Sequence, residues 1–218
     1  YYWYGANVIS EPYQDVTYNT YNTYNTYSSD NGFTGSGQSY TSSYEPAQTD
    51  VLDEPEFQSP ADLCFEHGVT LFEAGNYEDA AQQFREAVIL APDDIVLPFT
   101  YSQALFANGE YALAATVLRG AMLNIPEDEL TIYYPRGLYA DEELLDEQIK
   151  QLRNAIDKEP FAVDYQLLLG YQYLGKGDLD KAKRLLNRAA LSPANAPAAG
   201  KLLELTAKLE EEDLLESD

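Results

Sequence analysis

Cys64 and His67 are the single cysteine and the single histidine of the chain, and a spacing of three residues would bring them together on one helix. In cysteine enzymes an imidazole placed in this way removes the thiol proton and creates the nucleophile. Such a pair needs a third group that orients the base, and none follows in the sequence. A zinc site would need more cysteine or histidine than one of each. An enzyme that uses this pair is therefore the third of our three hypotheses.

The acidic and glycine-rich segments do not form a recognisable ligand site either. The acids at 53, 54 and 56 stand close together, but the chain has no D-x-D-x-D-G calcium loop. The glycines at 32, 35 and 37 lack the preceding strand and the lysine that a phosphate-binding loop requires. We therefore predict no catalytic residue, no bound metal and no cofactor.

The charge balance limits the class of partner. Acids outnumber bases by 37 to 13, and the first basic residue is Arg85. Nucleic acid and anionic membrane are disfavoured, because phosphate binding rests on clustered lysine and arginine. No run of about 18 apolar residues is present, so we expect no membrane insertion. The chain begins at Tyr1 without a methionine, which suits an exported protein after signal-peptide removal, and we expect it outside the cell or on its surface.

Residues 1–60 form a Tyr/Thr/Asn/Ser-rich low-complexity arm that contains no lysine or arginine. Residues 17–29 read TYNTYNTYNTYSS, and this period of three fits polyproline II rather than a helix or a strand. In that conformation the tyrosines form one stripe, which comprises Tyr18, Tyr21, Tyr24 and Tyr27. Ordering the backbone costs about 1–2 kcal/mol per residue, more than such a tract recovers alone. We therefore expect an extended, non-helical arm that contacts the rest of the chain or a neighbouring subunit.

From residue 61 the pattern changes to amphipathic helices with an internal period of 34 residues. The four repeats are 61–94, 95–128, 129–162 and 163–196. Their shared residues are Gly75, Gly109 and Gly177; Ala80, Ala114 and Ala182; Phe84, Leu118, Leu152 and Leu186; and Pro92, Pro126 and Pro160. Glycine ends the first helix of a pair, alanine lets two helices approach closely, and proline ends the second helix.

These repeats resemble the tetratricopeptide repeat (TPR) family, and residues 67–94 read HGVTLFEAGNYEDAAQQFREAVILAPDD. The resemblance covers residues 61–196. It implies an all-α solenoid, in which antiparallel helix pairs stack into a right-handed superhelix and the first helix of each pair lines a concave groove. Cys64 and His67 would then face the paired helix, as a buried thiol and a packed imidazole. The Tyr-rich leader and the acidic balance also resemble a group of exported bacterial TPR proteins.

The third repeat departs from the pattern, because Pro135 and Gly137 interrupt its first helix. Its second helix is expected intact from about 141 to 158. Two interpretations stay open for the interruption: a degenerate repeat repaired by a long loop, and a functional notch in the groove. Residues 197–218 are expected to form a capping helix and an acidic tail, with the leucines at 202, 203, 205 and 209 on the last pair and residues 210–213 facing water.

The resemblance also implies which residues line the groove. We call them the aromatic trough: Phe65, Val69, Phe72, Phe99, Gln103, Phe106, Leu167, Tyr171 and Leu174. They do not match the Lys/Asn/Arg carboxylate clamp with which some TPR proteins hold chaperone tails. Two interpretations stay open here as well. Either these side chains pack between neighbouring repeats, or they bind an extended segment with apolar side chains on one side.

The leading hypothesis is a non-enzymatic structural protein that assembles with other copies of itself. The tyrosine stripe of one subunit would lie on the aromatic trough of the next, and the homopolymer would grow as an extracellular filament. A row of hydroxyl residues would stay exposed and open to O-glycosylation; it comprises Thr17, Thr20, Thr23, Thr26, Ser28 and Ser29. The alternative is a soluble TPR adaptor that binds a peptide segment of another protein in its groove and stays monomeric.

Overall fold

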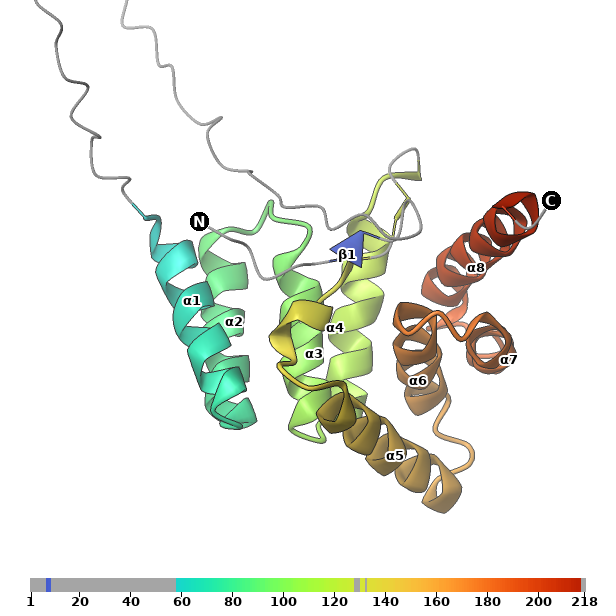
Figure 1. The fold of residues 1–218 in the computed structure, drawn as a ribbon, viewed down its shortest axis with the longest axis horizontal. Coiled ribbons are helices and arrows are strands. Elements are labelled where there is room, and N and C mark those ends of the chain that lie inside the picture. The colour runs from blue at the N-terminus through green and yellow to red at the C-terminus, as the bar shows by residue number, and fades with distance from the viewer. Residues whose placement is uncertain (1–6, 9–57, 128–129, 132, 217–218) are drawn as a thin grey trace, which may run out of the picture. The chain divides into compact units, whose positions relative to one another are not determined.

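The computed structural model describes residues 7–8, 58–127, 130–131 and 133–216 (Figure 1). All of them belong to one unit of the chain, while residues 19–57 form a second unit that lies outside the described residues. In chain order the elements are β1 (Asn7–Val8), α1 (Pro60–Glu73), α2 (Tyr77–Leu90), α3 (Leu97–Ala107), α4 (Tyr111–Asn124), β2 (Tyr133–Tyr134), the 3-10 helix η2 (Arg136–Leu138), α5 (Glu142–Lys158), α6 (Val163–Gly175), α7 (Leu179–Ala189) and α8 (Ala196–Glu216).

The first helices of three pairs end as their glycines predict. Gly75, Gly109 and Gly177 have φ angles of 79°, 81° and 78°, which side chains other than glycine rarely tolerate. At the end of α1 the Gly75 N–H donates to the Phe72 carbonyl, and the next N–H donates to the Leu71 carbonyl, each at 2.9 Å. This Schellman pattern satisfies carbonyls that the helix end leaves free and turns the chain into α2.

Within a pair, a glycine of the first helix lies directly against a large side chain of the second. A Cβ added at Gly68 of α1 would stand 2.6 Å from the Phe84 ring of α2, and one added at Gly170 of α6 would stand 2.8 Å from Leu186 of α7. Phe84 and Leu186 are fully buried. The missing side chains therefore set the close approach of α1 to α2 and of α6 to α7.

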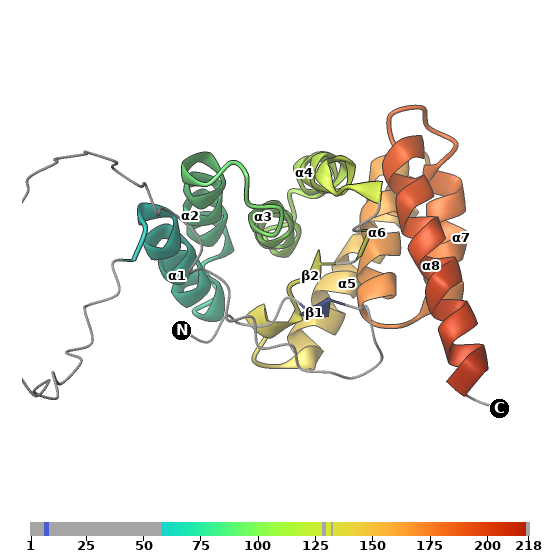
Figure 2. The same cartoon turned by 90° about the horizontal axis from the view of Figure 1, so that it is seen from above.

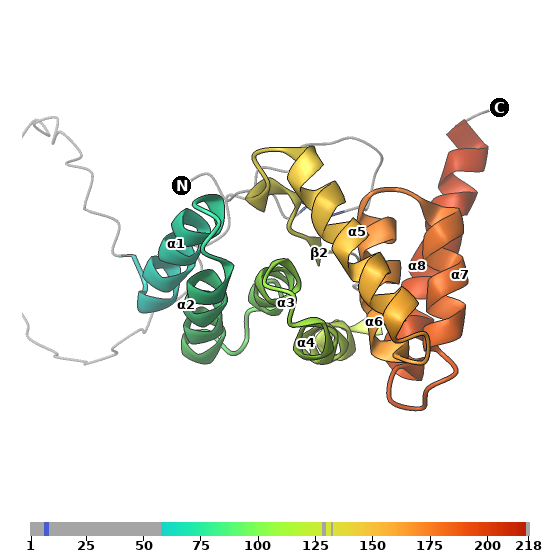
Figure 3. The same cartoon turned by 90° about the horizontal axis from the view of Figure 1, so that it is seen from below.

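The third repeat does not form a regular layer of the stack. Among its described residues no first helix forms, as Pro135 and Gly137 predict, and α4 packs directly on α6. The displaced elements instead contact the first helices of other pairs: β2 contacts α3, η2 contacts α1, and α5 contacts α6. Figures 2 and 3 show β2 and α5 on one side of the row formed by α1 to α4. The second and fourth repeats are thus neighbours, and the third lies across them.

The C-terminal helix α8 covers the last pair, as predicted for a cap. Leu202 and Leu205 are 0% and 4% exposed. Lys201 donates a hydrogen bond of 2.6 Å to the Ile125 carbonyl, which ties α8 to the end of α4. Glu210 does not simply face water, because it forms an ion pair with Lys183 of α7 at 2.6 Å. Within the described residues, no helix has the length and hydropathy needed to cross a membrane.

Candidate functional site: the aromatic trough and its insert

The structure brings the nine residues of the aromatic trough together but buries every one of them. Phe65 is 8% exposed, Val69 is 6% exposed, and the other seven are at most 1% exposed. The expectation of an open groove lined by these side chains is therefore corrected. Of the two interpretations that the sequence left open, burial favours the one in which the side chains pack inside the fold.

Residues 133–139, which we call the insert, contribute the side chains that cover the trough. The Tyr133 ring lies 5.5 Å from the Phe99 ring, measured between centroids. The Tyr139 ring meets Phe72 edge-on at 5.1 Å. The Tyr134 ring packs on Tyr171 at 5.4 Å. Pairs of this geometry each add about 0.5–1.5 kcal/mol beyond their buried area, so the three tyrosines of the insert help to stabilise the packed trough.

A hydrogen-bond network fixes the insert between α3 and α6. Gln172 Nε2 donates to Gln103 Oε1 at 3.0 Å, which joins the two helices. The Tyr134 hydroxyl donates to Gln172 Oε1 at 2.7 Å, and Gln103 Nε2 donates to the Tyr139 hydroxyl at 2.8 Å. The Tyr139 hydroxyl in turn donates to Gln148 Oε1 of α5 at 2.7 Å. Buried polar groups are costly without partners, so these amides favour an insert that carries phenol groups at matching positions.

Backbone contacts add to the fit of the insert. The Tyr171 hydroxyl donates to the Tyr133 carbonyl. The Tyr134 ring lies against the backbone of α6, since a Cβ added at Gly175 would stand 2.3 Å from its Cδ2 atom. A glycine at this position is therefore required by the insert rather than by the helix.

Burial keeps the phenols of the network in their neutral form. It raises the pKa of Tyr134, Tyr139 and Tyr171 well above the ordinary value of 10.0. Loss of hydration is the largest cause, and a neighbouring tyrosine at each site adds to it. The hydroxyl groups of all three residues therefore act as hydrogen-bond donors at neutral pH.

The insert also carries the strand pair that joins the arm to the helical region. Asn7 pairs with Tyr134 and Val8 pairs with Tyr133 in an antiparallel arrangement. Of the predicted arm, residues 1–60, the structure describes residues 7–8 and 58–60, and α1 already begins at Pro60. The tyrosine stripe and the six hydroxyl residues of the arm all lie outside the described residues.

The Cys64 and His67 pair does not have the surroundings that the resemblance implied. Cys64 is a half-buried free thiol, and His67 is exposed. The expectation of a packed imidazole is therefore wrong, because the side chain of His67 is exposed on α1. Among the described residues, no group of three or more His, Cys, Asp and Glu side chains lies close enough together to hold a metal.

Reasoning from the sequence missed most of the network. It named Gln103 and Tyr171 but not Tyr134, Tyr139, Gln148 or Gln172. The available signal was the run YYPRGLY at 133–139, in which three tyrosines stand where a helix is interrupted. Aromatic side chains on an irregular segment need a surface to cover them, and the adjacent trough is that surface.

The comparison with known families agrees with the helix pairs and their glycine caps. Two tetratricopeptide repeat families match, one over residues 71–130 and the other over residues 145–199, and together they span just over half of the chain. The insert lies between the two matches. No curated protein matches the sequence. Tetratricopeptide repeats are scaffolds for protein–protein interaction. The repeated pattern, the paired helices and both matches show that the chain belongs to the tetratricopeptide repeat family.

Proposed function

We propose that this TPR protein is a non-enzymatic structural protein that assembles with copies of itself, the arm of one subunit docking on the helical region of the next. The observation that carries the proposal is the pairing of β1 with β2. Addition of an extended segment to a short strand is a common mode of peptide recognition, since backbone hydrogen bonds supply affinity without a demanding sequence. The insert contains such a strand, β2, beside the aromatic trough.

The same pairing fits an exchange between subunits. About 50 residues separate Val8 from α1, so the linker permits the arm to reach its own insert or that of a neighbour. Exchange of one segment between identical chains replaces one set of contacts by an identical set and so costs little. Each subunit has one arm and one insert. A contact of this head-to-tail type propagates as a filament unless the rotation between subunits closes a ring.

The remaining features of the proposal concern the arm and its surroundings. The tyrosine stripe would extend the contact that begins at β1, and the row of threonine and serine hydroxyls would face outward and accept O-linked sugars. The location outside the cell belongs to the same proposal. A soluble adaptor needs an accessible trough, and the burial of all nine trough residues does not favour it.

Light scattering coupled to size-exclusion chromatography tests the proposal on three full-length proteins: the native chain, Val8→Pro and Val8→Thr. Proline lacks the N–H that a strand donates, while threonine keeps it and favours extended backbone. We expect concentration-dependent assemblies for the native chain and Val8→Thr, with filaments in negative-stain micrographs, and loss of both for Val8→Pro. A native chain that stays monomeric at every concentration would overturn the proposal in favour of the adaptor.

A further inference from the structure

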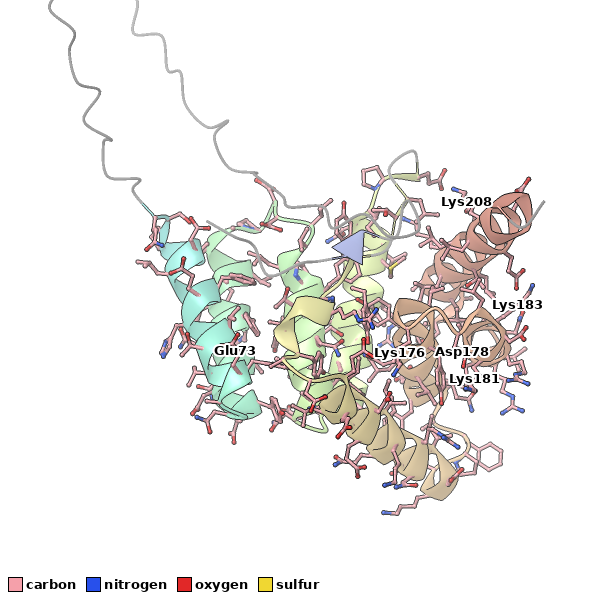
Figure 4. The ribbon with its side chains drawn as sticks, in the orientation of Figure 1. Glu73, Lys176, Asp178, Lys181, Lys183 and Lys208 are labelled. Carbon is pink, nitrogen blue, oxygen red and sulfur yellow. The ribbon has the colours of Figure 1, made fainter. Side chains whose placement is uncertain are left out.

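The outer face of α7 is basic in a chain of net charge −24. Ala182, Leu186 and Ala189 turn inward and are fully buried, while the exposed side chains of α7 include Lys181, Lys183, Arg184 and Arg188. Figure 4 shows where Lys181 and Lys183 lie on this helix. Asp178 raises the pKa of Lys181, and Arg153 of α5, which is exposed, lies close enough to Lys181 to oppose that shift slightly. We call Arg153, Lys181, Lys183, Arg184 and Arg188 the basic face.

The lysines and the arginines of this face differ in their partners. Lys181 pairs with Asp178, and Lys183 pairs with both carboxylate oxygens of Glu210, at 2.9 and 2.6 Å. Within the part of the chain that the structure describes, the guanidinium groups of the three arginines form neither an ion pair nor a hydrogen bond, although Arg184 lies within electrostatic range of Asp178. Guanidinium groups bind carboxylates with two parallel hydrogen bonds, so these arginines offer unused capacity for an acidic partner.

The geometry of the arginines fits an extended acidic segment. Arg184 and Arg188 are four residues apart on α7 and so project from the same side, about 5–6 Å apart at their Cβ atoms. Arg184 also lines a shallow hollow with Asp180, Lys183 and Asn187. Alternate residues of an extended chain point the same way and are about 6.6 Å apart. Two carboxylates spaced by one residue on an extended segment therefore match the two guanidinium groups.

The chain itself contains a segment with that spacing. Residues 53–56 read DEPE, so Glu54 and Glu56 are acids spaced by one residue, and the proline between them disfavours helix at Glu54. No lysine or arginine precedes Arg85, so no basic residue lies close to this run in the sequence. We propose that residues 53–56 of one copy dock on the basic face of a second copy, an inference that rests on the self-assembly proposed above and adds a second contact to it.

Docking within one copy is disfavoured by reach. Residue 53 lies seven residues before α1, so an extended connection spans about 25 Å at most. The contacts between α1 and α7 run through α2, α3, α4 and α6, and each step between packed helices is about 8–10 Å. Figures 1 and 2 show α1 and α7 at opposite ends of the row of helices. The basic face of a second copy is therefore the accessible one.

Fluorescence anisotropy of a labelled peptide with the sequence of residues 45–57 tests the inference on the full-length chain. The peptide should bind at low salt and dissociate as salt rises, because exposed charges are screened. We expect Arg184→Glu/Arg188→Glu to weaken binding roughly tenfold or more, and a peptide with Asn and Gln in place of its acids to bind as weakly. Arg85→Glu/Lys208→Glu is the matched charge control, since Arg85 is an exposed residue of α2 and Lys208 an exposed residue of α8, neither of them part of the basic face, and it should leave binding within about twofold of native.

Charge exchange gives the sharpest outcome. A peptide with Glu54→Lys and Glu56→Lys should bind Arg184→Glu/Arg188→Glu better than it binds the native chain. Equal binding to all chains, absence of binding at low salt, or equal binding of a single-stranded oligonucleotide of the same length would each overturn the inference. Peptide binding by a chain that never assembles would uphold this contact and reject the self-assembly proposal. Assembly through the arm without peptide binding would do the reverse.

Discussion

The missing Cβ of Gly175 leaves room for the Tyr134 ring in the trough. The Tyr134 ring lies where a Cβ at residue 175 would be, and its hydroxyl donates to Gln172 one turn earlier on α6. A larger residue at 175 would therefore push the ring out and break the hydrogen bond together with the packing. The glycine at position 175 of α6 is therefore explained by the insert that packs against it.

We predict that Gly175→Ala lowers the free energy of unfolding by about 1–3 kcal/mol, because the added methyl group overpacks the site. Urea denaturation followed by circular dichroism measures the change. Gly200→Ala is the control, since nothing lies within 4 Å of a Cβ there and α8 should gain about 0.5–1 kcal/mol from the better helix former. Changes of the same sign in the two proteins would contradict the assigned position of Tyr134.

The buried phenols predict how stability depends on pH. Folding raises the pKa of Tyr134, Tyr139 and Tyr171. Their contribution to the free energy of unfolding is therefore complete below about pH 10, the pKa of tyrosine in the unfolded chain, and is lost as the pH rises above that value. Above that pH, each buried phenol lowers the free energy of unfolding by about 1.4 kcal/mol per pH unit. We expect the free energy of unfolding, measured by urea denaturation between about pH 9 and 11, to fall steeply as the pH rises. In Tyr139→Phe this decline should be shallower by the effect of one proton. An unchanged slope in that variant would contradict its buried, neutral state.

At the scale of elements, α8 stabilises the last helix pair from one side. Leu202 is fully buried, whereas Lys208 is exposed and forms an ion pair with Glu204 on its own helix, at 3.1 Å. We predict that Leu202→Ala lowers the free energy of unfolding by about 2–5 kcal/mol and that Lys208→Ala changes it by less than about 0.5 kcal/mol. Thermal denaturation of both variants checks this. Similar melting temperatures for Leu202→Ala and the native chain would show that α8 is not a cap.

The helix pairs could be predicted from the sequence because their determinants are local. A glycine with positive φ, a small residue at a crossing and a proline after the second helix each act within one repeat, and Gly75, Gly109 and Gly177 all lie where the pattern placed them. The path of the third repeat could not be predicted in this way. Pro135 and Gly137 exclude a helix, but only contacts with the distant α1, α3 and α6 determine where the interrupted segment lies.

The sequence named the residues of the trough but not the side chains that cover them. The trough residues gather as the repeat pattern implies, yet their exposure depends on Tyr133, Tyr134 and Tyr139, which belong to a different repeat. A polar pair such as Gln103 and Gln172 is separated by 69 residues in sequence, so no local pattern reveals it. The sequence therefore named residues of the trough, and the structure shows that the insert covers them.

At the scale of the whole molecule, the account depends on where the arm of each subunit pairs. Asn7 and Val8 are opposite Tyr134 and Tyr133, and the long linker allows the pair to form within one chain or between two chains. Opposite residues of an antiparallel pair have Cα atoms about 4.5–5.5 Å apart, which lies in the range that a disulfide spans. A cysteine pair at Val8 and Tyr133 can therefore report which chain supplies the arm.

The most direct measurement is disulfide trapping between two distinguishable full-length copies, one with Val8→Cys and the other with Tyr133→Cys, both in a Cys64→Ala background. Arm exchange predicts a covalent heterodimer on a non-reducing gel after the copies are mixed and oxidised, and none of that species from either copy alone. A mixture that gives no heterodimer, while a single chain with both cysteines closes an internal disulfide at every concentration, would contradict the account, because each arm would then bind its own subunit.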